Sequence, residues 1–198
     1  MNKTPGYDEV QEYTGSRSLP KGGYICTIVK LEEAVSKNGN DMIKVYLDIA
    51  EGDYKGIYSE KYKAQADPMT AKWKCIHYIT VLDTTTKKTS SRFKTFITSV
   101  EKSNAGFVVA NCWGDNFAKF FKGKNVGVIF GDEWFVKDDG TPERYAKPRF
   151  ICSVETIRKG DFKIPDDDKS QLNGASAFDS FAKASPVEDV AFEDDLPF

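Results

Sequence analysis

The alternation of apolar and polar residues predicts strands in the first part of the chain. Residues 42–50, MIKVYLDIA, place apolar side chains on one face and Lys44, Tyr46 and an aspartate on the other. Strict alternation of this kind is typical of a half-buried strand. Residues 22–31, GGYICTIVKL, follow a Pro-Lys-Gly-Gly turn and predict a preceding strand. After the turn EGDYKG, residues 56–63 are expected to be its hairpin partner.

The hydrophobic period changes further along the chain. Residues 64–89 carry no sustained period and are expected to form a loop. In residues 90–104 the apolar side chains recur at i, i+3, i+4 and i+7, which predicts an amphipathic helix. Ser90 or Ser91 can cap its start, and Gly106 follows its end.

Two more strands are predicted at residues 123–136 and 144–153, joined by the turn KDDGTP, and residues 153–160 predict a short closing helix. Five strands with one helix between the early and the late strands suit an OB-like antiparallel β-barrel, mainly β with one or two helices. A different small antiparallel barrel or a sandwich would give a similar order of elements. We place this domain at residues 19–160, after an N-terminal arm at residues 1–18.

Beyond Ile164 the chain is rich in Asp, Ser and Ala, and its apolar residues are too sparse to close a core. Residues 165–198 are therefore expected to be a disordered tail. This segment has a net charge of −7, whereas residues 1–164 have a net charge of +5. A basic body beside an acidic tail indicates a polyanionic partner for the body and an internal competitor for it.

Several classes of function find little support in the sequence. The longest apolar runs are too short to span a bilayer, and the first residues do not resemble a signal peptide, so the cytoplasm is the expected location. The cysteines (Cys26, Cys75, Cys112 and Cys152) are scattered and are interpreted as reduced thiols. His77 is the one histidine, and no second ligand pair accompanies Cys75-x-His77, so we expect no metal and no cofactor.

Basic and aromatic residues are interleaved along much of the body. Cations that follow phosphates, with rings that take bases, are the two ingredients of a single-strand-binding groove. Lys44 and Tyr46, which share one strand face, are the strongest candidate pair, and Lys137 and Lys147 extend the pattern. The candidate DNA-binding residues are Lys44, Tyr46, Tyr54, Lys55, Tyr58, Lys61, Tyr62, Lys63, Lys72, Trp73, Lys74, Trp134, Arg144, Tyr145 and Arg149.

The enzymatic alternative is a metal-dependent nuclease. Asp41 or Asp48, followed by Asp53-x-Lys55, resembles the arrangement of acidic residues and a lysine in many magnesium-dependent nucleases. The D-x-K segment lies in a glycine-flanked turn, and short matches of this kind arise by chance in charged chains. We therefore expect a protein that is not an enzyme.

The last residues, FEDDLPF, resemble the acidic C-terminal tip of bacterial single-stranded DNA-binding proteins, which docks replication, recombination and repair partners. The resemblance implies that Asp194, Asp195, Leu196, Pro197 and Phe198 bind such partners. The ring of Phe198 would fill an apolar pocket and the acidic groups would meet a basic rim. This tip departs from the family pattern by placing a glutamate before only two aspartates.

The body is similar to a family of phage and prophage proteins from Gram-positive hosts, described as single-stranded DNA-binding or recombination-associated. The stretches LDIAEGDYKG, FKTFITSVEKSN, GKNVGVIFGDE and SVETIRKGDFKIP carry this resemblance. It implies a phage-encoded protein that coats single-stranded DNA in the host cytoplasm during replication or recombination. The main alternative is a recombination mediator or adaptor that acts mainly through its tail.

Overall fold

The computed structural model describes residues 18–67 and 69–172. The expected N-terminal arm up to residue 17 and the tail from residue 173, including the tip Asp194–Phe198, lie outside the described residues. Within them, the elements in chain order are β1 (Gly22–Val35), β2 (Asp41–Ile49), α1 (Ile57–Lys63), β3 (Ile76–Thr80), α2 (Ser91–Ser103), the 3-10 turns η1 (Val109–Asn111) and η2 (Phe117–Phe121), β4 (Asn125–Val136), β5 (Pro142–Cys152) and α3 (Val154–Lys159).

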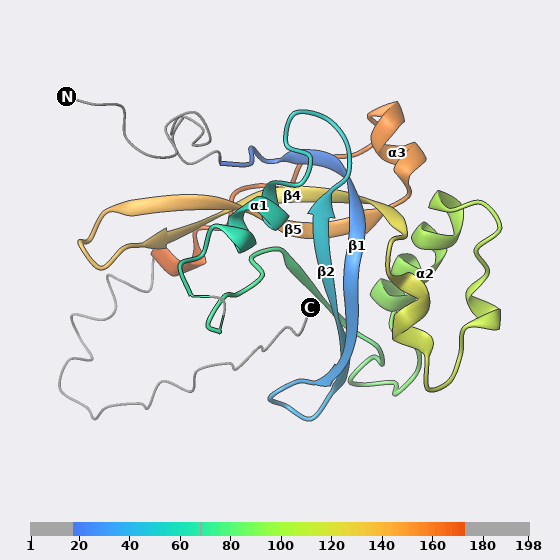
Figure 1. Cartoon of the computed structure of the whole chain (residues 1–198). Coiled ribbons are helices and arrows are strands. Elements are labelled where there is room, and N and C mark those ends of the chain that lie inside the picture. Colours follow the sequence, from blue (N-terminus) through green and yellow to red (C-terminus); the bar gives the residue numbers. More distant parts are fainter. Residues whose placement is uncertain (1–17, 68, 173–198) are drawn as a thin grey trace.

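The strands form one five-stranded antiparallel sheet in the order β3-β2-β1-β4-β5. The two edge strands approach each other, and Nδ1 of His77 on β3 donates to the carbonyl oxygen of Pro148 on β5 at 3.1 Å. The sheet is thereby nearly closed into a barrel, and α2 packs beside one end of it (Figure 1). The structure confirms the expected OB-like antiparallel barrel.

Strand β1 is the longest element and takes part in both halves of the barrel. Its first residues pair with β4 and its later residues pair with β2, with a register shift between Ile28 and Lys30. A bulge of this kind bends a strand and increases its twist, which lets one strand serve both halves. The largest side chains that it encloses with its neighbours include Ile28, Leu47, Phe96, Phe121 and Phe130, all fully buried.

Helix α2 confirms the amphipathic pattern of the sequence. Phe93, Phe96, Ile97 and Val100 face the core, and the Ser90 side chain accepts a hydrogen bond from the N–H of Phe93 at 3.1 Å. Each large apolar side chain buried in this way contributes roughly 1.5–3 kcal/mol.

Two expectations for residues 56–89 were wrong. Residues 57–63 form α1, because the buried carboxylate of Asp48 accepts hydrogen bonds from the N–H groups of Tyr58 at 3.0 Å and Ser59 at 3.1 Å. These are donors that a helix start leaves without a partner. The expected loop 64–89 contains β3, a short strand that completes the barrel beside β2.

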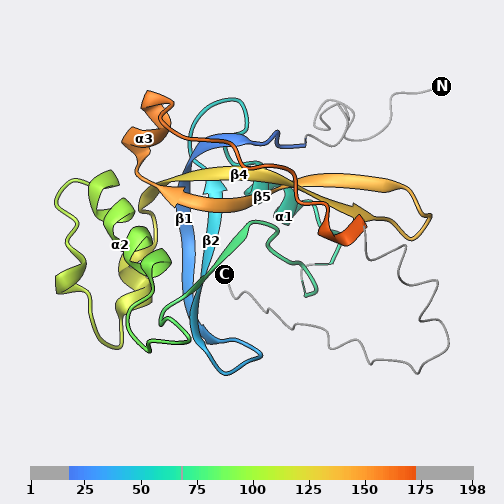
Figure 2. The ribbon, with the colours of Figure 1, turned by 180° about the vertical axis from the view of Figure 1, so that it is seen from behind.

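The expectation of a disordered tail from residue 165 was also wrong as far as residue 172. We call residues 161–168 the strap, because they run from α3 back across the sheet (Figure 2). The pairing of β4 with β1 ends at Phe130, and beyond it the N–H of Trp134 donates to the carbonyl oxygen of Asp168 at 2.8 Å. The N–H of Asp168 in turn donates to the carbonyl oxygen of Asp132 at 2.8 Å. The strap thus satisfies backbone groups that β1 leaves open.

Candidate functional site

A groove of about 570 Å³ opens over β2 and β3, between α1, the segment before β3 and strand β5. It lies on the β2–β3 face, through which OB folds bind oligonucleotides. Four lysines and five aromatic side chains line it, which makes it both cationic and apolar. They are Lys61, Lys72, Lys74, Lys147, Tyr46, Tyr58, Trp73, Tyr78 and Tyr145.

Three of these rings form the floor of the groove and are buried. The Trp73 indole N–H donates to the carbonyl oxygen of Leu47 at 3.0 Å, and the Tyr46 hydroxyl donates to Glu32 at 2.7 Å. Tyr58 is also buried. The expectation that Tyr46 lies exposed on a strand face was wrong, because its side chain is fully buried and its hydroxyl is bonded to Glu32. Its ring gives the groove shape rather than a free stacking surface.

The exposed rings are Tyr78 on β3, which is 47% exposed, and Tyr145 on β5, which is 41% exposed. Tyr78 lines the groove and pairs in register with Lys44 of β2, which does not line it. Tyr78 was not among the predicted DNA-binding residues. The signal for it was the short run of β-branched and aromatic residues from Ile76 to Thr80, which the surrounding loop-like residues concealed.

On the α1 side of the groove, the Gln65 side chain clamps the backbone of Lys72. The Gln65 side chain accepts a hydrogen bond from the N–H of Lys72 at 2.8 Å and donates to the carbonyl oxygen of Lys72 at 3.0 Å. This clamp and the Trp73 indole fix the backbone so that Lys72 and Lys74 remain exposed at the groove. Lys61 on α1 faces the same groove, and partial burial lowers its pKa.

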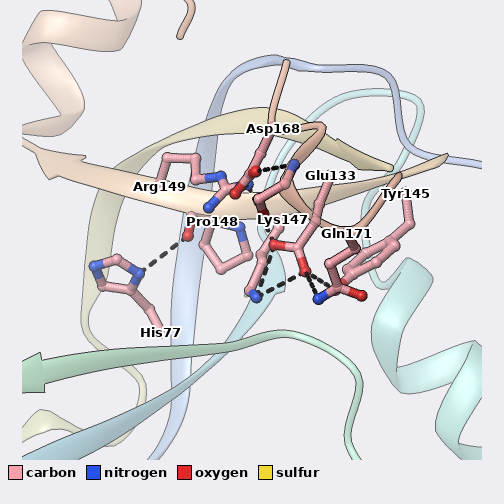
Figure 3. Close-up of polar contacts among 9 residues, drawn as sticks. His77, Glu133, Tyr145, Lys147, Pro148, Arg149, Asp168 and Gln171 are labelled. Carbon is pink, nitrogen blue, oxygen red and sulfur yellow. Dashed lines mark hydrogen bonds and ion pairs between the residues drawn. The ribbon is translucent and has the colours of Figure 1, made fainter. Parts of the chain in front are cut away.

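On the β5 side, one buried carboxylate gathers the polar side chains (Figure 3). Glu133 accepts hydrogen bonds from the Tyr145 hydroxyl at 2.8 Å and from Arg149 at 3.2 Å, and pairs with Lys147 at 2.8 Å. Burial opposes ionisation of Glu133, but the hydrogen bonds from Lys147 and Tyr145 hold its pKa below the ordinary value. Partial burial and the bond to Glu133 raise the pKa of Tyr145 to about 12. No sequence pattern indicated this role for Glu133.

The predicted cations of β5 are already paired with protein carboxylates. Arg149 also contacts Asp168 of the strap at 2.9 Å, and Arg144 contacts Asp132 at 2.6 Å. The bonds from Ser170, and then the one from Arg149, lower the pKa of Asp168 to about 2. Arg144 and Arg149 therefore fix the strap and the sheet edge, and neither lines the groove.

The remaining predicted residues do not line the groove. Tyr54 packs edge-on against Tyr24 at 6.2 Å, and Tyr62 packs behind Trp73 at 5.6 Å. Trp134 donates from its indole to Asp167 at 3.2 Å and has Arg144 and Lys169 over its ring. The others that lie outside the groove are Lys44, Lys55 and Lys63.

The structure offers no metal-binding cluster within residues 18–67 and 69–172. The carboxylate of Asp48, a candidate for the nuclease arrangement, accepts hydrogen bonds from the first turn of α1. Cys75 is buried, and burial raises the pKa of its thiol. The Nδ1 of His77 donates a hydrogen bond to the carbonyl oxygen of Pro148.

The first half of the chain is similar to a known sequence family. Residues 7–104 match the sequence model of a family described as a protein of unknown function, DUF669. The matched stretch includes β1, β2, α1, β3 and α2, and it ends before β4. No curated protein matches the chain. None of the helices in the described part of the chain has the length and apolar character needed to cross a bilayer.

Proposed function

We propose that this protein binds single-stranded DNA without sequence specificity and that it is not an enzyme. The observation that carries the proposal is the groove on the β2–β3 face, where exposed Tyr78 and Tyr145 lie with Lys61, Lys72 and Lys74. Rings and cations in one groove match the two requirements of single-strand binding.

In this mechanism the lysines neutralise phosphates along one side of the groove. The rings of Tyr78 and Tyr145 stack on bases, and each stacked base contributes roughly 1–3 kcal/mol. Every base has a ring face, so such binding tolerates any sequence. Stacking needs bases that are not enclosed in a duplex, so single strands are preferred.

The cellular setting rests on the sequence resemblance. We propose a role in phage DNA replication or recombination in the bacterial cytoplasm, with Asp194–Phe198 recruiting partner proteins. We also propose that the acidic tail competes with DNA for the basic body. Support for the competition comes from the charge of the two parts, since residues 165–198 have a net charge of −7 and residues 1–164 a net charge of +5.

A second candidate function is a recombination adaptor with weak DNA contacts of its own. The observation that favours it is the pairing of Arg144, Lys147 and Arg149 with carboxylates, which leaves fewer cations for phosphates. A strand-annealing assay with and without the recombination partner separates the two, since an adaptor acts only when the partner is present.

The decisive experiment is a titration of labelled oligo-dT, and of a duplex of equal length, with the full chain at several salt concentrations. We expect a strong preference for the single strand, which is lost in part when Lys72 and Lys74 are replaced by Ala. The matched control is Lys102→Ala, because Lys102 is exposed on α2 and does not line the groove. Equal affinity for both DNAs, or an equal effect of the control, would contradict the proposal.

A further inference from the structure

A second groove, of about 610 Å³, lies between the β1–β2 hairpin and the turns that follow α2. It shares no lining residue with the groove over β2 and β3. Much of its wall is apolar and includes Val35, Met42, Phe93, Trp113 and Phe117. The proposed DNA-binding function makes no use of it.

Trp113 is the dominant feature of this second groove. Its side chain is 62% exposed, although tryptophan is normally well buried. One face of its indole stacks on Phe117, with ring centroids 5.0 Å apart and planes 11° apart. Phe117 is itself buried against Phe121 at 4.8 Å, so the indole is anchored to the core. The groove therefore presents a large aromatic side chain that is already held in place.

Such an arrangement is typical of a protein-binding anchor. Tryptophan is enriched among the residues that dominate binding energy at protein interfaces. A ring fixed before association loses little conformational freedom on binding. Val35, which also lines the groove, is 65% exposed and widens the apolar surface next to the indole.

Charge identifies the occupant. Glu33, Asp41 and Asp115 line the second groove, and among the described residues no lysine or arginine does. The DNA-binding candidate groove has the opposite character, since its charged lining residues are all lysines. A phosphate backbone would be repelled from the second groove, and so would the acidic segment that contains Asp194 and Asp195.

We propose that this second groove binds a segment of a partner protein in which an apolar side chain is flanked by lysine or arginine. The apolar side chain packs on the open face of Trp113, and the basic residues pair with Glu33, Asp41 and Asp115. This site is independent of the proposed DNA binding, and both grooves can be occupied together.

The test begins with a random peptide library selected on the full-length protein. We expect the recovered peptides to share an aromatic or aliphatic residue next to lysine or arginine. The affinity of a recovered peptide is then measured with variants. Trp113→Ala should weaken binding by about tenfold or more, since exposed anchors of this kind dominate interface energy. Glu33→Gln combined with Asp115→Asn should weaken binding several-fold and reduce its salt dependence.

Matched controls keep the outcome clear. Phe150→Ala removes a ring that is 54% exposed on β5 and lines neither groove, and it should leave peptide binding unchanged. Trp113→Phe should restore part of the affinity, and oligo-dT binding should be the same in all these variants. Acidic or unrelated peptides, an unchanged affinity in Trp113→Ala, or a loss of oligo-dT binding in that variant would overturn the proposal. Self-association that Trp113→Ala abolishes would assign the groove to a second copy instead, and would also overturn it.

Discussion

The ring Nδ1 of His77 donates a hydrogen bond to the carbonyl oxygen of Pro148 at 3.1 Å, and this bond joins the two edge strands of the sheet. Burial lowers the pKa of His77 to about 4, an effect that the Pro148 carbonyl opposes and the nearby Arg92 charge supports. The barrel is thus closed by a neutral imidazole between β3 and β5.

This closure predicts a loss of stability at mildly acidic pH. Between the ordinary pKa of about 6.5 and the folded value of about 4, the unfolded chain binds a proton at His77 and the folded chain does not. The free energy of unfolding should therefore fall as the pH falls through this window, by on the order of 3 kcal/mol in total. Urea unfolding at a series of pH values measures it.

His77→Leu is the control for this prediction. His77 is the one histidine of the chain, so no other imidazole titrates in the window. The variant loses the bond to Pro148 and should be less stable at neutral pH, but its stability should be nearly flat from pH 6.5 to pH 5. A slope equal to that of the natural protein would show that other groups cause the dependence.

The two exposed rings of the groove should carry the stacking energy. Tyr78→Ala and Tyr145→Ala should each weaken oligo-dT binding by roughly 1–3 kcal/mol. Phe150→Ala is the matched control, because its ring is exposed on the same sheet edge but outside the groove. Fluorescence anisotropy at fixed salt measures the three affinities, and equal losses in all three would argue against a defined stacking site.

Tyr145→Phe separates the ring from its hydroxyl. The hydroxyl donates to the buried Glu133, whereas the ring is expected to face the base. We expect this variant to keep most of the oligo-dT affinity and to lose some thermal stability, because Glu133 loses one donor. A loss as large as that of Tyr145→Ala would mean that the hydroxyl, not the ring, matters for binding.

Most of the fold could be predicted from the sequence, and the elements that were predicted wrongly have physical causes. Period-two alternation and the Ser90 cap locate β2 and α2 because both signals are local. Residues 57–63 form a short segment with two tyrosines, which is typical of a strand. They form α1 because Asp48, on another element, accepts hydrogen bonds from its first turn. The strap was missed for a similar reason, since its hydrogen-bond partners lie on the distant β4.

The candidate site was readable only in part. Interleaved lysines and rings marked residues 72–74 and Tyr145, which do line the groove. Composition does not show which ring is covered. The sequence therefore predicts an exposed Tyr46, which is buried, and does not single out Tyr78, which is exposed. The neutralisation of Arg144 and Arg149 by Asp132, Glu133 and Asp168 was hidden as well, because those pairs join different segments.

The pairing of the β5 cations leads to a prediction about salt dependence. Each phosphate neutralised on a single strand contributes about 0.7 to the slope of log K against log salt. Lys61→Ala, Lys72→Ala and Lys74→Ala should each reduce the magnitude of the slope by up to about that amount. Arg144→Gln should leave the slope unchanged, because Arg144 is already paired with Asp132. A reduction in the slope for Arg144→Gln equal to that for the lysine variants would show that the ion pair opens on DNA.

Removal of residues 173–198 should tighten oligo-dT binding at low salt and have little effect at high salt. This segment contains six acidic residues and one lysine, and its removal leaves the strap in place. A full-length variant with those six acidic residues replaced by Asn or Gln should behave in the same way, since the competition is electrostatic. Unchanged affinity in both variants would count against the tail as a competitor.

The close packing of the strap on the sheet should depend on a glycine. A Cβ on Gly23 would lie 2.4 Å from the Cζ of Phe162, so the strap can cross β1 this closely only because residue 23 has no side chain. Gly23→Ala should destabilise the protein by about 1–3 kcal/mol, as overpacking usually does. In a Phe162→Ala background the same change should cost much less, because the ring that it displaces is gone. Urea unfolding of the two single variants and the double variant measures this coupling. Additive losses would show that Phe162 does not hold the strap against β1.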